Sequence, residues 1–426
     1  MNDLNDQINQ YDNQIYDMIK KLNVQNITEN YYEKEEIKNL CITILGNIFE
    51  FYEIQNGNDS LSKSKRLYIQ NFLENRISEK CSMYEKRLEK KKNIKEIVEN
   101  LKNLELPEQR SKEWYEIREG ILTASSLADA LGKGHFNTRE SLLIDKTSKE
   151  KKKYFTNEII QWGVKYEPIA TNFYEEMNQL KIVEFGLVPH PEFPIFGASP
   201  DGICDVDSSV DYIGRMLEIK CPPVRKFWEK PGEVPLHYWM QMQGQLETCD
   251  LEECDFLQVK ILEYSNETEY NEDNYIENDT MKEGYSKTGY PKGLVIELID
   301  GEGDEKTYDY LYPEFYLSSK ELKDWAEKEI KDYEKKYKEC HYRWWRIERY
   351  DCTLVGRDVE WWNENAFKII EFWEDVEFYR KEGNQQLIDK KANRKKKRAE
   401  SKKKKQINVI KIENIPYMLD TSSDDD

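Results

Sequence analysis

The sequence predicts an α/β fold with a central mixed β-sheet flanked by helices, preceded by an α-helical N-terminal module. Three observations lead to this prediction. From Trp114 onward, short apolar segments bounded by Pro, Gly and Asp turns alternate with amphipathic helical segments. Residues 1–105 contain neither Pro nor Trp, which marks a boundary near Pro107. The chain of 426 residues is long enough for about two or three domains and a sizeable core.

Composition argues against several classes of protein. The formal net charge is -19, and no apolar run approaches the roughly 20 residues that a membrane helix needs. The opening residues, MNDLNDQINQ, lack the basic-then-apolar pattern of a signal peptide. The eight cysteines are scattered without a CxxC pair, and only four histidines occur, so free thiols are expected rather than disulfides or a zinc site. We therefore expect an intracellular, cytoplasmic protein that does not bind a membrane.

The leading module, residues 1–105, reads as a set of helices. The segments LNDQINQYDNQIYDMIKKL and IKNLCITILGNIFEFYEI carry apolar residues at helical spacing. NGNDS interrupts this pattern, and a third helix is expected to run to about Leu104. The module contains no motif with an obvious chemical role. We predict that it docks on the core or binds a partner protein.

The predicted core spans residues 106–350 and includes an exposed acidic insertion at about 265–290. Helices are expected in TASSLADALG, NEIIQWGVKYEPIATNFYEEM, PLHYWMQMQGQLETC and SSKELKDWAEKEIKDYEKKYKEC. Strands are expected in KIVEFGLVPH, PIFGASPDGICDV, GRMLEIKC, CDFLQVKILEY and PKGLVIELID. The alternation of the two kinds of segment predicts a sheet covered by helices.

Behind the core, residues 351–388 are predicted to form an aromatic helical extension packed on it. The tryptophans of this aromatic region lie in stretches that read as helical, and core packing is favoured over base stacking: Trp344, Trp345, Trp361 and Trp362. Residues 389–426 are predicted to be a disordered tail, first basic and then acidic. The basic run at 390–405 is a solvated tail, a weak nucleic-acid contact or a nuclear-import signal.

The turn SPDG and the strand LEIK carry the residues with chemical potential. Asp201 lies in the turn, and a hairpin would bring it beside Glu218. Glu218 and Lys220 share one face of the strand, while Leu217 and Ile219 face the core. Two adjacent carboxylates repel, and a divalent cation removes that conflict. Oxygen ligands, including the Ile219 carbonyl, favour Mg²⁺ or Mn²⁺ over zinc, and Lys220 would neutralise charge at a phosphate beside the metal-bound water.

An ordinary strand with an exposed Glu–Lys pair has the same local pattern, so the wider context decides. An Asp followed by Glu-x-Lys on the next strand resembles PD-(D/E)xK nucleases, which have a restriction-endonuclease-like core. Five blocks resemble the lambda-exonuclease or YqaJ-type viral recombinase branch in its order: WYEIREGILTAS, GVKYEPIA, GASPDG, LEIKCP and YWMQMQGQL. They run from about Trp114 to about Val259, roughly a third of the chain.

The resemblance implies roles for particular residues. Asp201 and Glu218 correspond to the metal ligands of the family, and Lys220 corresponds to its catalytic lysine. Glu167 corresponds to the helical acidic residue that completes the metal environment, although taken alone it reads as a surface glutamate.

Three further residues take roles from the same resemblance. Arg118 and Ser125 correspond to positions that hold the 5′-phosphate of a DNA end, which suits the charge-assisted hydrogen bonds of Arg and a site near a helix N-terminus. Gln241 corresponds to the glutamine that orients water or the scissile phosphate. Gln243 lies roughly 200° around the helix, so both glutamines cannot face the site.

The resemblance implies a Mg²⁺-dependent DNA nuclease that hydrolyses phosphodiester bonds, and a 5′-end-directed exonuclease in viral-type recombination or repair. DNA with duplex ends is the expected partner, together with a recombination partner protein. A structure-specific endonuclease on the same core and a non-catalytic DNA-binding scaffold are the alternatives. The leading module, the insertion and the C-terminal extension depart from the compact ring-forming pattern, so the oligomeric state stays open.

Overall fold

The computed structural model describes residues 93–148, 157–209, 211–223, 232–303, 306–394, 396–397 and 400–401. The chain divides into two units, Met1–Ile94 and Lys95–Asp426, and the fold below is that of the second. Of the predicted N-terminal module, residues 93–105 are described, with a helix at 93–102, and the rest lies outside the described residues. No helix in the described ranges has the length and apolar character to cross a membrane.

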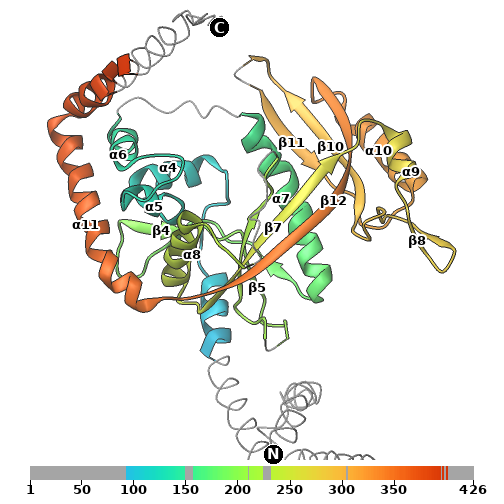
Figure 1. Ribbon diagram of the computed structural model, residues 1–426, viewed down its shortest axis with the longest axis horizontal. Coiled ribbons are helices and arrows are strands. Elements are labelled where there is room, and N and C mark those ends of the chain that lie inside the picture. Colours follow the sequence, from blue (N-terminus) through green and yellow to red (C-terminus); the bar gives the residue numbers. More distant parts are fainter. Residues whose placement is uncertain are drawn as a thin grey trace, which may run out of the picture. The chain divides into compact units, whose positions relative to one another are not determined.

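A seven-stranded mixed sheet forms the centre of the second unit (Figure 1). Its strand order is β11-β10-β12-β7-β6-β5-β2. β6 and β7 run parallel, whereas the other neighbouring pairs are antiparallel. This architecture confirms the predicted α/β fold with a central mixed sheet. The strands are β2 (Ile182–Val183), β5 (Gly202–Cys204), β6 (Met216–Lys220), β7 (Glu253–Glu263), β10 (Lys292–Asp300), β11 (Thr307–Leu311) and β12 (Glu339–Gly356).

One face of the sheet is covered by α7 (Glu158–Asn178), which confirms the long amphipathic helix predicted there. The side chain of Asn157 caps the helix by accepting a hydrogen bond from a backbone N–H of its first turn. Apolar residues of α7 such as Tyr166 share one buried cluster with Leu217 and Ile219 of β6. Neighbouring residues of a strand face opposite sides of the sheet, so Glu218 faces away from this cluster.

A second layer lies beyond the other face of β6. It contains a three-stranded sheet of order β1-β4-β3 and a separate apolar cluster that joins β1 and β4 to α5, α6 and α11. Its helix α8 packs against α5, η2 and β4 and supplies contacts to Glu218. Apolar burial in this layer fixes the position of α8 against the sheet. The elements are α4 (Lys112–Gly120), β1 (Leu122–Thr123), η2 (Ala124–Ser126), α5 (Leu127–Ala130), α6 (Arg139–Thr147), β3 (Val188–Pro189), β4 (Phe196–Ala198), α8 (Leu236–Cys249) and α11 (Val359–Glu382).

The region of the acidic insertion is partly buried. It contains α9 (Glu267–Glu272) and a hairpin of β8 (Tyr275–Glu277) and β9 (Thr280–Lys282). The hairpin is largely exposed, as predicted for the insertion. Tyr270 and Ser286, however, are buried at 2% and 0% exposure, because α9 and the end of the insertion pack on the sheet beside α10 (Ser319–Tyr333).

The helical interpretation of the region around Trp344 and Trp345 is wrong. Both lie in β12, an 18-residue strand that crosses the core (Figure 1). Trp345 packs in the cluster with α7, and Trp344 packs in the cluster with α10, so each face of the strand is covered. These two side chains are buried in the core, as the sequence favoured.

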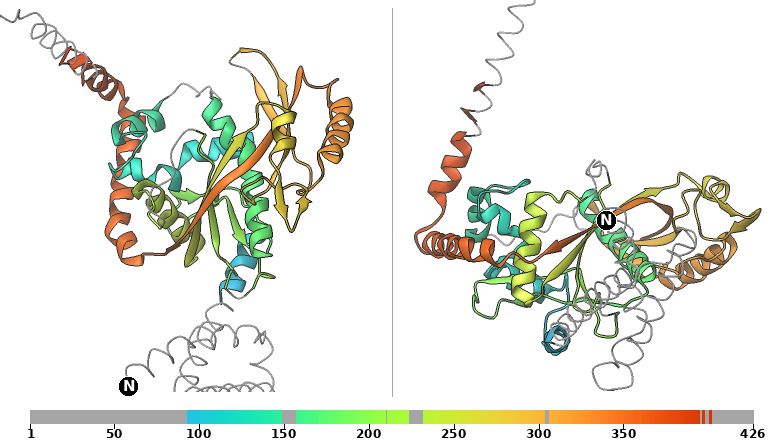
Figure 2. Two further views of the ribbon diagram at one scale, coloured as in Figure 1. Left: turned by 45° about the vertical axis from the view of Figure 1, so that its right-hand side comes forward. Right: turned by 60° about the horizontal axis from the view of Figure 1, so that its bottom comes forward.

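The C-terminal boundaries also differ from those expected. Residues 351–356 are the end of β12, and α11 starts at Val359. Residues 385–394 are helical, so the start of the predicted disordered tail at 389 is ordered. Residues 402–426 lie outside the described residues. Figure 2 shows α11 and α10 at opposite ends of this unit.

Candidate active site

Asp201 lies in the turn that joins β4 to β5, next to β6 in the sheet. Its Oδ2 accepts a hydrogen bond from the backbone N–H of Ile219 at 2.6 Å, which fixes the carboxylate beside the strand that carries Glu218. Gly202 follows Asp201 because the backbone passes close to β2. A Cβ there would lie 2.2 Å from Cγ2 of Ile182, so a larger residue would push the turn away from the strand.

Side chains from outside the sheet hold the same turn. Gln109 donates its Nε2 to the carbonyl oxygens of Phe185, at 2.8 Å, and Pro200, at 3.1 Å. Trp114 donates its indole N–H to Oγ of Ser199 at 3.1 Å. Both donors come from the segment directly before or within α4. The turn is therefore fixed from two sides before any ligand is bound.

Glu218 is fully buried, and both of its carboxylate oxygens accept hydrogen bonds. Oε1 accepts from the ammonium of Lys220 and from Nε2 of Gln241, the latter at 2.7 Å. Oε2 accepts from Nε2 of Gln245 at 2.7 Å. A buried carboxylate is costly without partners, and here one cation and two amides supply them. The strand and α8 together place three donors around one acid.

The charges around Lys220 explain its ionisation state. Burial alone would lower the pKa of Lys220, but the carboxylates of Glu218 and Asp201 outweigh burial and hold that pKa well above its ordinary value. Burial, then the charges of Glu218 and Glu167, raise the pKa of Asp201 well above its ordinary value. Lys220 is therefore a fixed cation beside acids that repel one another.

Glu167, on α7, joins this group from the other side. Its Oε1 accepts from Nη2 of Arg110 at 2.9 Å. Burial raises the pKa of Glu167, against the lowering effect of the cations Arg110 and Lys220 and with a raising effect of Glu218. Arg110 has a left-handed backbone with φ of 68°, a conformation that costs of order 1 kcal/mol for a residue with a side chain.

Arg118 and Ser125 lie together. Nη2 of Arg118, on α4, donates to Oγ of Ser125, in η2, at 3.2 Å. The guanidinium lies 4.1 Å from the ring centroid of Trp114, which restricts its orientation. Ser125 also exchanges a hydrogen bond of 3.1 Å with Thr123. Arg118, Thr123 and Ser126 line an open cleft of about 1090 Å³.

This cleft connects the two groups of residues. Arg110 and Glu167 line it together with Arg118. The same two residues also line a smaller adjoining hollow of about 570 Å³ that reaches Asp201. A ligand that spans both hollows would therefore contact the acidic group at one end and the Arg118–Ser125 pair at the other.

The glutamines of α8 divide between two environments. Gln241 contacts Glu218, whereas Gln243 donates to the carbonyl oxygen of Gly356 at 2.9 Å and accepts from the backbone N–H of Asp358 at 2.7 Å. Gln243 therefore ties the end of β12 to α8. The two residues face different sides of the helix, as their spacing requires.

Three residues of the site were missed from the sequence. Gln245 lies one helical turn after Gln241, and this i, i+4 spacing is the signal that would have indicated it. Arg110 precedes α4 in a segment without a periodic pattern, and nothing local marks it as the partner of Glu167. Trp114 opened the recognised block, but its spacing alone does not show that it orients Arg118.

The carboxylate oxygens of the acidic group are ligands of the chemical type that a hard divalent cation prefers. Beyond the effect of burial, the charges of Glu218 and Glu167 raise the pKa of Asp201, and the charge of Glu218 raises the pKa of Glu167, a repulsion that a cation would relieve. Within the described residues, however, no three acidic, His or Cys side chains are gathered closely enough to hold an ion. The side-chain oxygen of Gln245 is buried without a hydrogen-bond partner there, and it could accept from a water that such an ion retains.

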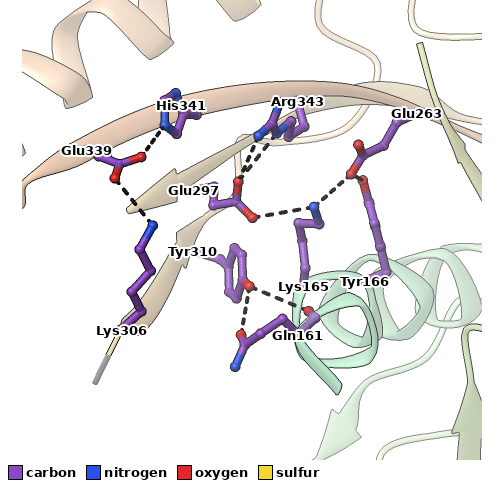
Figure 3. Close-up of polar contacts among 10 residues, drawn as sticks. All are labelled: Gln161, Lys165, Tyr166, Glu263, Glu297, Lys306, Tyr310, Glu339, His341 and Arg343. Carbon is purple, nitrogen blue, oxygen red and sulfur yellow. Dashed lines mark hydrogen bonds and ion pairs between the residues drawn. The ribbon is translucent and has the colours of Figure 1, made fainter. Parts of the chain in front are cut away.

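An ionic network anchors α7 at Lys165 and Tyr166 (Figure 3). These two residues directly precede Glu167, the acidic residue of α7 that lines the cleft. Nζ of Lys165 donates to Oε1 of Glu263 at 2.7 Å and lies 3.5 Å from Oε1 of Glu297. The hydroxyl of Tyr166 donates to the same Glu263 oxygen at 2.7 Å, and Arg343 lies 3.3 Å from Glu297. The helix is therefore tied to β7, β10 and β12 by charged groups as well as by apolar packing.

The structure thus combines an α/β core and a mixed sheet with an acidic turn beside a Glu-x-Lys strand. Residues 113–252 match the family described as the YqaJ-like viral recombinase domain. This match confirms the resemblance seen in the sequence. All of the predicted site residues fall within this domain.

The individual proteins that resemble this chain share low sequence identity with it. An uncharacterised protein of Acanthamoeba polyphaga mimivirus is 26% identical over 295 residues, which are 64% of this chain and 53% of the relative. The chain thus spans about half the length of that relative. The alkaline exonuclease LHK-Exo of Laribacter hongkongensis, in complex with dAMP, has a TM-score of 0.37 and 20% identity over 66% of this chain and 99% of its own. A phage-related exonuclease of Haemophilus somnus has a TM-score of 0.30 and 14% identity over 63% and 96%.

Proposed function

We propose that the protein is a Mg²⁺- or Mn²⁺-dependent deoxyribonuclease, and specifically a 5′-end-directed exonuclease acting in recombination or repair. The observation that carries the proposal is the fixed juxtaposition of Asp201 with β6, where Ile219 donates to it and Glu218 and Lys220 lie on either side of Ile219 in the strand. The YqaJ-like domain supports the same class of chemistry. DNA is the proposed substrate.

Asp201, Glu218 and the Ile219 carbonyl would hold the metal, with Glu167 beside them. The ion, when bound, supplies an activated water and a positive charge at the scissile phosphate. Lys220 remains protonated at neutral pH and offsets the negative charge that develops on that phosphate. Gln241, which donates to the same oxygen of Glu218 as Lys220, limits the rotation of that carboxylate and can turn its amide toward the phosphate.

The Arg118–Ser125 pair supports recognition of a DNA end. A guanidinium held against an aromatic ring and a neighbouring hydroxyl together offer several donors to one phosphate group. Arg118 lines the cleft together with Glu167, which places the pair beside a path to the acidic group. A terminal 5′-phosphate at this pair would leave the chain of the substrate leading toward the acids, as a 5′-directed exonuclease requires.

Two alternatives use the same observations differently. An endonuclease would use the acidic group without the phosphate pair, and the open cleft would admit an internal strand. A DNA-binding scaffold would not need Lys220 and Glu218 in contact inside the core, where the charges are costly to bury. A recombination partner protein and self-assembly both fit the proposed role, and the described residues do not favour one assembly.

The proposal is tested with linear and circular duplex DNA in the presence of Mg²⁺, Mn²⁺ or EDTA. Loss of linear DNA only, dependent on the metal, supports the exonuclease. Nicking of closed circles supports the endonuclease instead. Metal-independent binding without cleavage of either substrate would support the scaffold and contradict the nuclease.

A further inference from the structure

A second groove, about 760 Å³ in volume, adjoins the large cleft of the candidate site. Asn137, before α6, lines both hollows, so the two lie next to each other at this residue. We call the second one the C-terminal groove, because its far wall includes Leu387, Lys390 and Arg394 of the helical segment 385–394. Figure 1 shows α6 beside α11, with this helical segment following α11.

Among the charged residues that line the C-terminal groove, cations outnumber acids. Two acids lie in it, and each is already paired with an arginine. Nη2 of Arg139 lies 2.7 Å from Oδ2 of Asp375, and Nη1 of Arg394 lies 2.9 Å from Oε2 of Glu140. These pairs join α6 to α11 and to the C-terminal helical segment, so they hold the walls of the groove together.

Lys390 and Lys391 supply the positive charge of the groove that its two acids, each paired with an arginine, do not neutralise. Both line the groove and both are exposed to solvent. In the described part of the chain, neither ammonium has an acidic side chain within ion-pair distance. Two adjacent lysines without acids to neutralise them stand out in a chain whose formal net charge is -19. Such a local excess attracts polyanions even when the average surface repels them.

The sign of the charge on the lining residues changes along the three neighbouring hollows. At the end near Asp201, the lining contains more acids than cations, with Glu167 and Glu184 among them. At the other end, the C-terminal groove presents Lys390 and Lys391. A polyanion lying along this path would have its reacting phosphate at the end that suits a metal ion, and its more distant phosphates among the lysines.

We propose that the C-terminal groove binds the phosphate backbone of the substrate DNA at a distance from the reacting end. The proposal rests on the proposed function for the identity of the polyanion, and it adds a binding surface outside the YqaJ-like domain, whose match ends at residue 252. The groove increases affinity for long DNA and takes no part in the hydrolysis.

The test measures DNA affinity by fluorescence anisotropy in EDTA, so that cleavage plays no part. The protein is compared with the double variant Lys390→Glu/Lys391→Glu on 5′-phosphorylated duplexes of about 10 and about 30 base pairs at several salt concentrations. Lys328→Glu/Lys331→Glu on α10 is the matched control, since it makes the same change in net charge at the opposite end of the unit. Thermal unfolding of all three proteins checks that they fold.

We expect the groove variant to lose about tenfold or more in affinity for the long duplex, and its plot of log affinity against log salt to become shallower by about 2. The short duplex and the control should change less than about twofold. Lys390→Gln/Lys391→Gln should give an intermediate loss. Equal affinities of groove and control variants for the long duplex would overturn this inference alone. A wild-type protein that binds neither duplex would overturn the proposed function and the inference with it.

Discussion

Gln245 donates its side-chain amide to Oε2 of Glu218 at 2.7 Å, and both side chains are almost completely buried. Gln245→Met keeps the volume but removes the donor from a buried carboxylate, which should lower the free energy of unfolding by about 1.5–3 kcal/mol. Urea denaturation measures the loss. Gln241→Met is the comparison, because Oε1 of Glu218 keeps Lys220 as a partner, and its loss should be under about 1 kcal/mol. Equal losses would show that Glu218 does not depend on Gln245.

Asp201→Asn separates stability from catalysis. Burial and the nearby acids already oppose the ionised form of Asp201, and Asn retains an acceptor for the N–H of Ile219. We therefore expect unchanged or slightly higher thermal stability without metal, no stabilisation by added Mg²⁺, and at least about a 100-fold loss of cleavage. Thermal unfolding with and without Mg²⁺ is run beside the cleavage assay. Wild-type cleavage in this variant would exclude Asp201 as a ligand.

Arg118→Ala tests recognition of the end. Hydrogen bonds to charged groups contribute about 1.5–3 kcal/mol, so the wild type should prefer 5′-phosphorylated to 5′-hydroxyl duplex ends by about tenfold to a hundredfold. The variant should lose this preference and cleave both substrates at the slower rate that the wild type shows on 5′-hydroxyl ends. Initial rates on the two substrates measure it. Lys112→Ala, an exposed change on the same helix, should leave the preference intact. Equal wild-type rates on both substrates would favour the endonuclease.

Asp273 should make the free energy of unfolding depend on pH in the acidic range. Burial would raise its pKa, but hydrogen bonds from the backbone of Lys287, from Tyr264 and from Arg346 hold that pKa below its ordinary value. Because the folded pKa is the lower one, the contribution to stability is complete above about pH 4 and is lost as the pH falls through the folded pKa.

The corresponding variant is Asp273→Asn. It should be less stable than wild type at pH 7 and lose less stability between about pH 4 and pH 2. Urea unfolding across this range measures both quantities. Asp279→Asn, in the turn between β8 and β9, is the control and should follow the wild-type curve. Identical curves for wild type and Asp273→Asn would mean that the carboxylate stabilises nothing.

The sequence predicted secondary structure correctly where one face of an element is buried, as in α7. It was misleading in β12, where both faces are buried. The period of α7 is evident because one side packs on the sheet and the other does not. In β12, adjacent Trp344 and Trp345 are both buried, on opposite faces, so the two-residue alternation of a strand is hidden. The same double coverage places Glu218 at 0% exposure, although an exposed Glu–Lys pair has the same local sequence.

The partners of the site residues were harder to predict than the residues themselves. Asp201, Glu218 and Lys220 lie in short motifs with recognisable spacing. Arg110 contacts Glu167, which lies 57 residues further along the chain. The left-handed backbone conformation of Arg110 is not indicated by the neighbouring residues in the sequence. Long-range pairing of this kind is decided by the packing of whole elements, so a single sequence does not contain it in local form.

The position of β12 in the sheet has a consequence for the order of synthesis. Residues 339–356 pair with β7 on one side and β10 on the other, so both of those strands have an open edge until the ribosome has passed Gly356. Every residue assigned here to hydrolysis is already made by then. A chain released early would carry the complete set of reactive side chains on a sheet with two uncovered apolar edges, which favours aggregation. Insertion of β12 thus completes the sheet only after all of the residues proposed to act in hydrolysis have been synthesised.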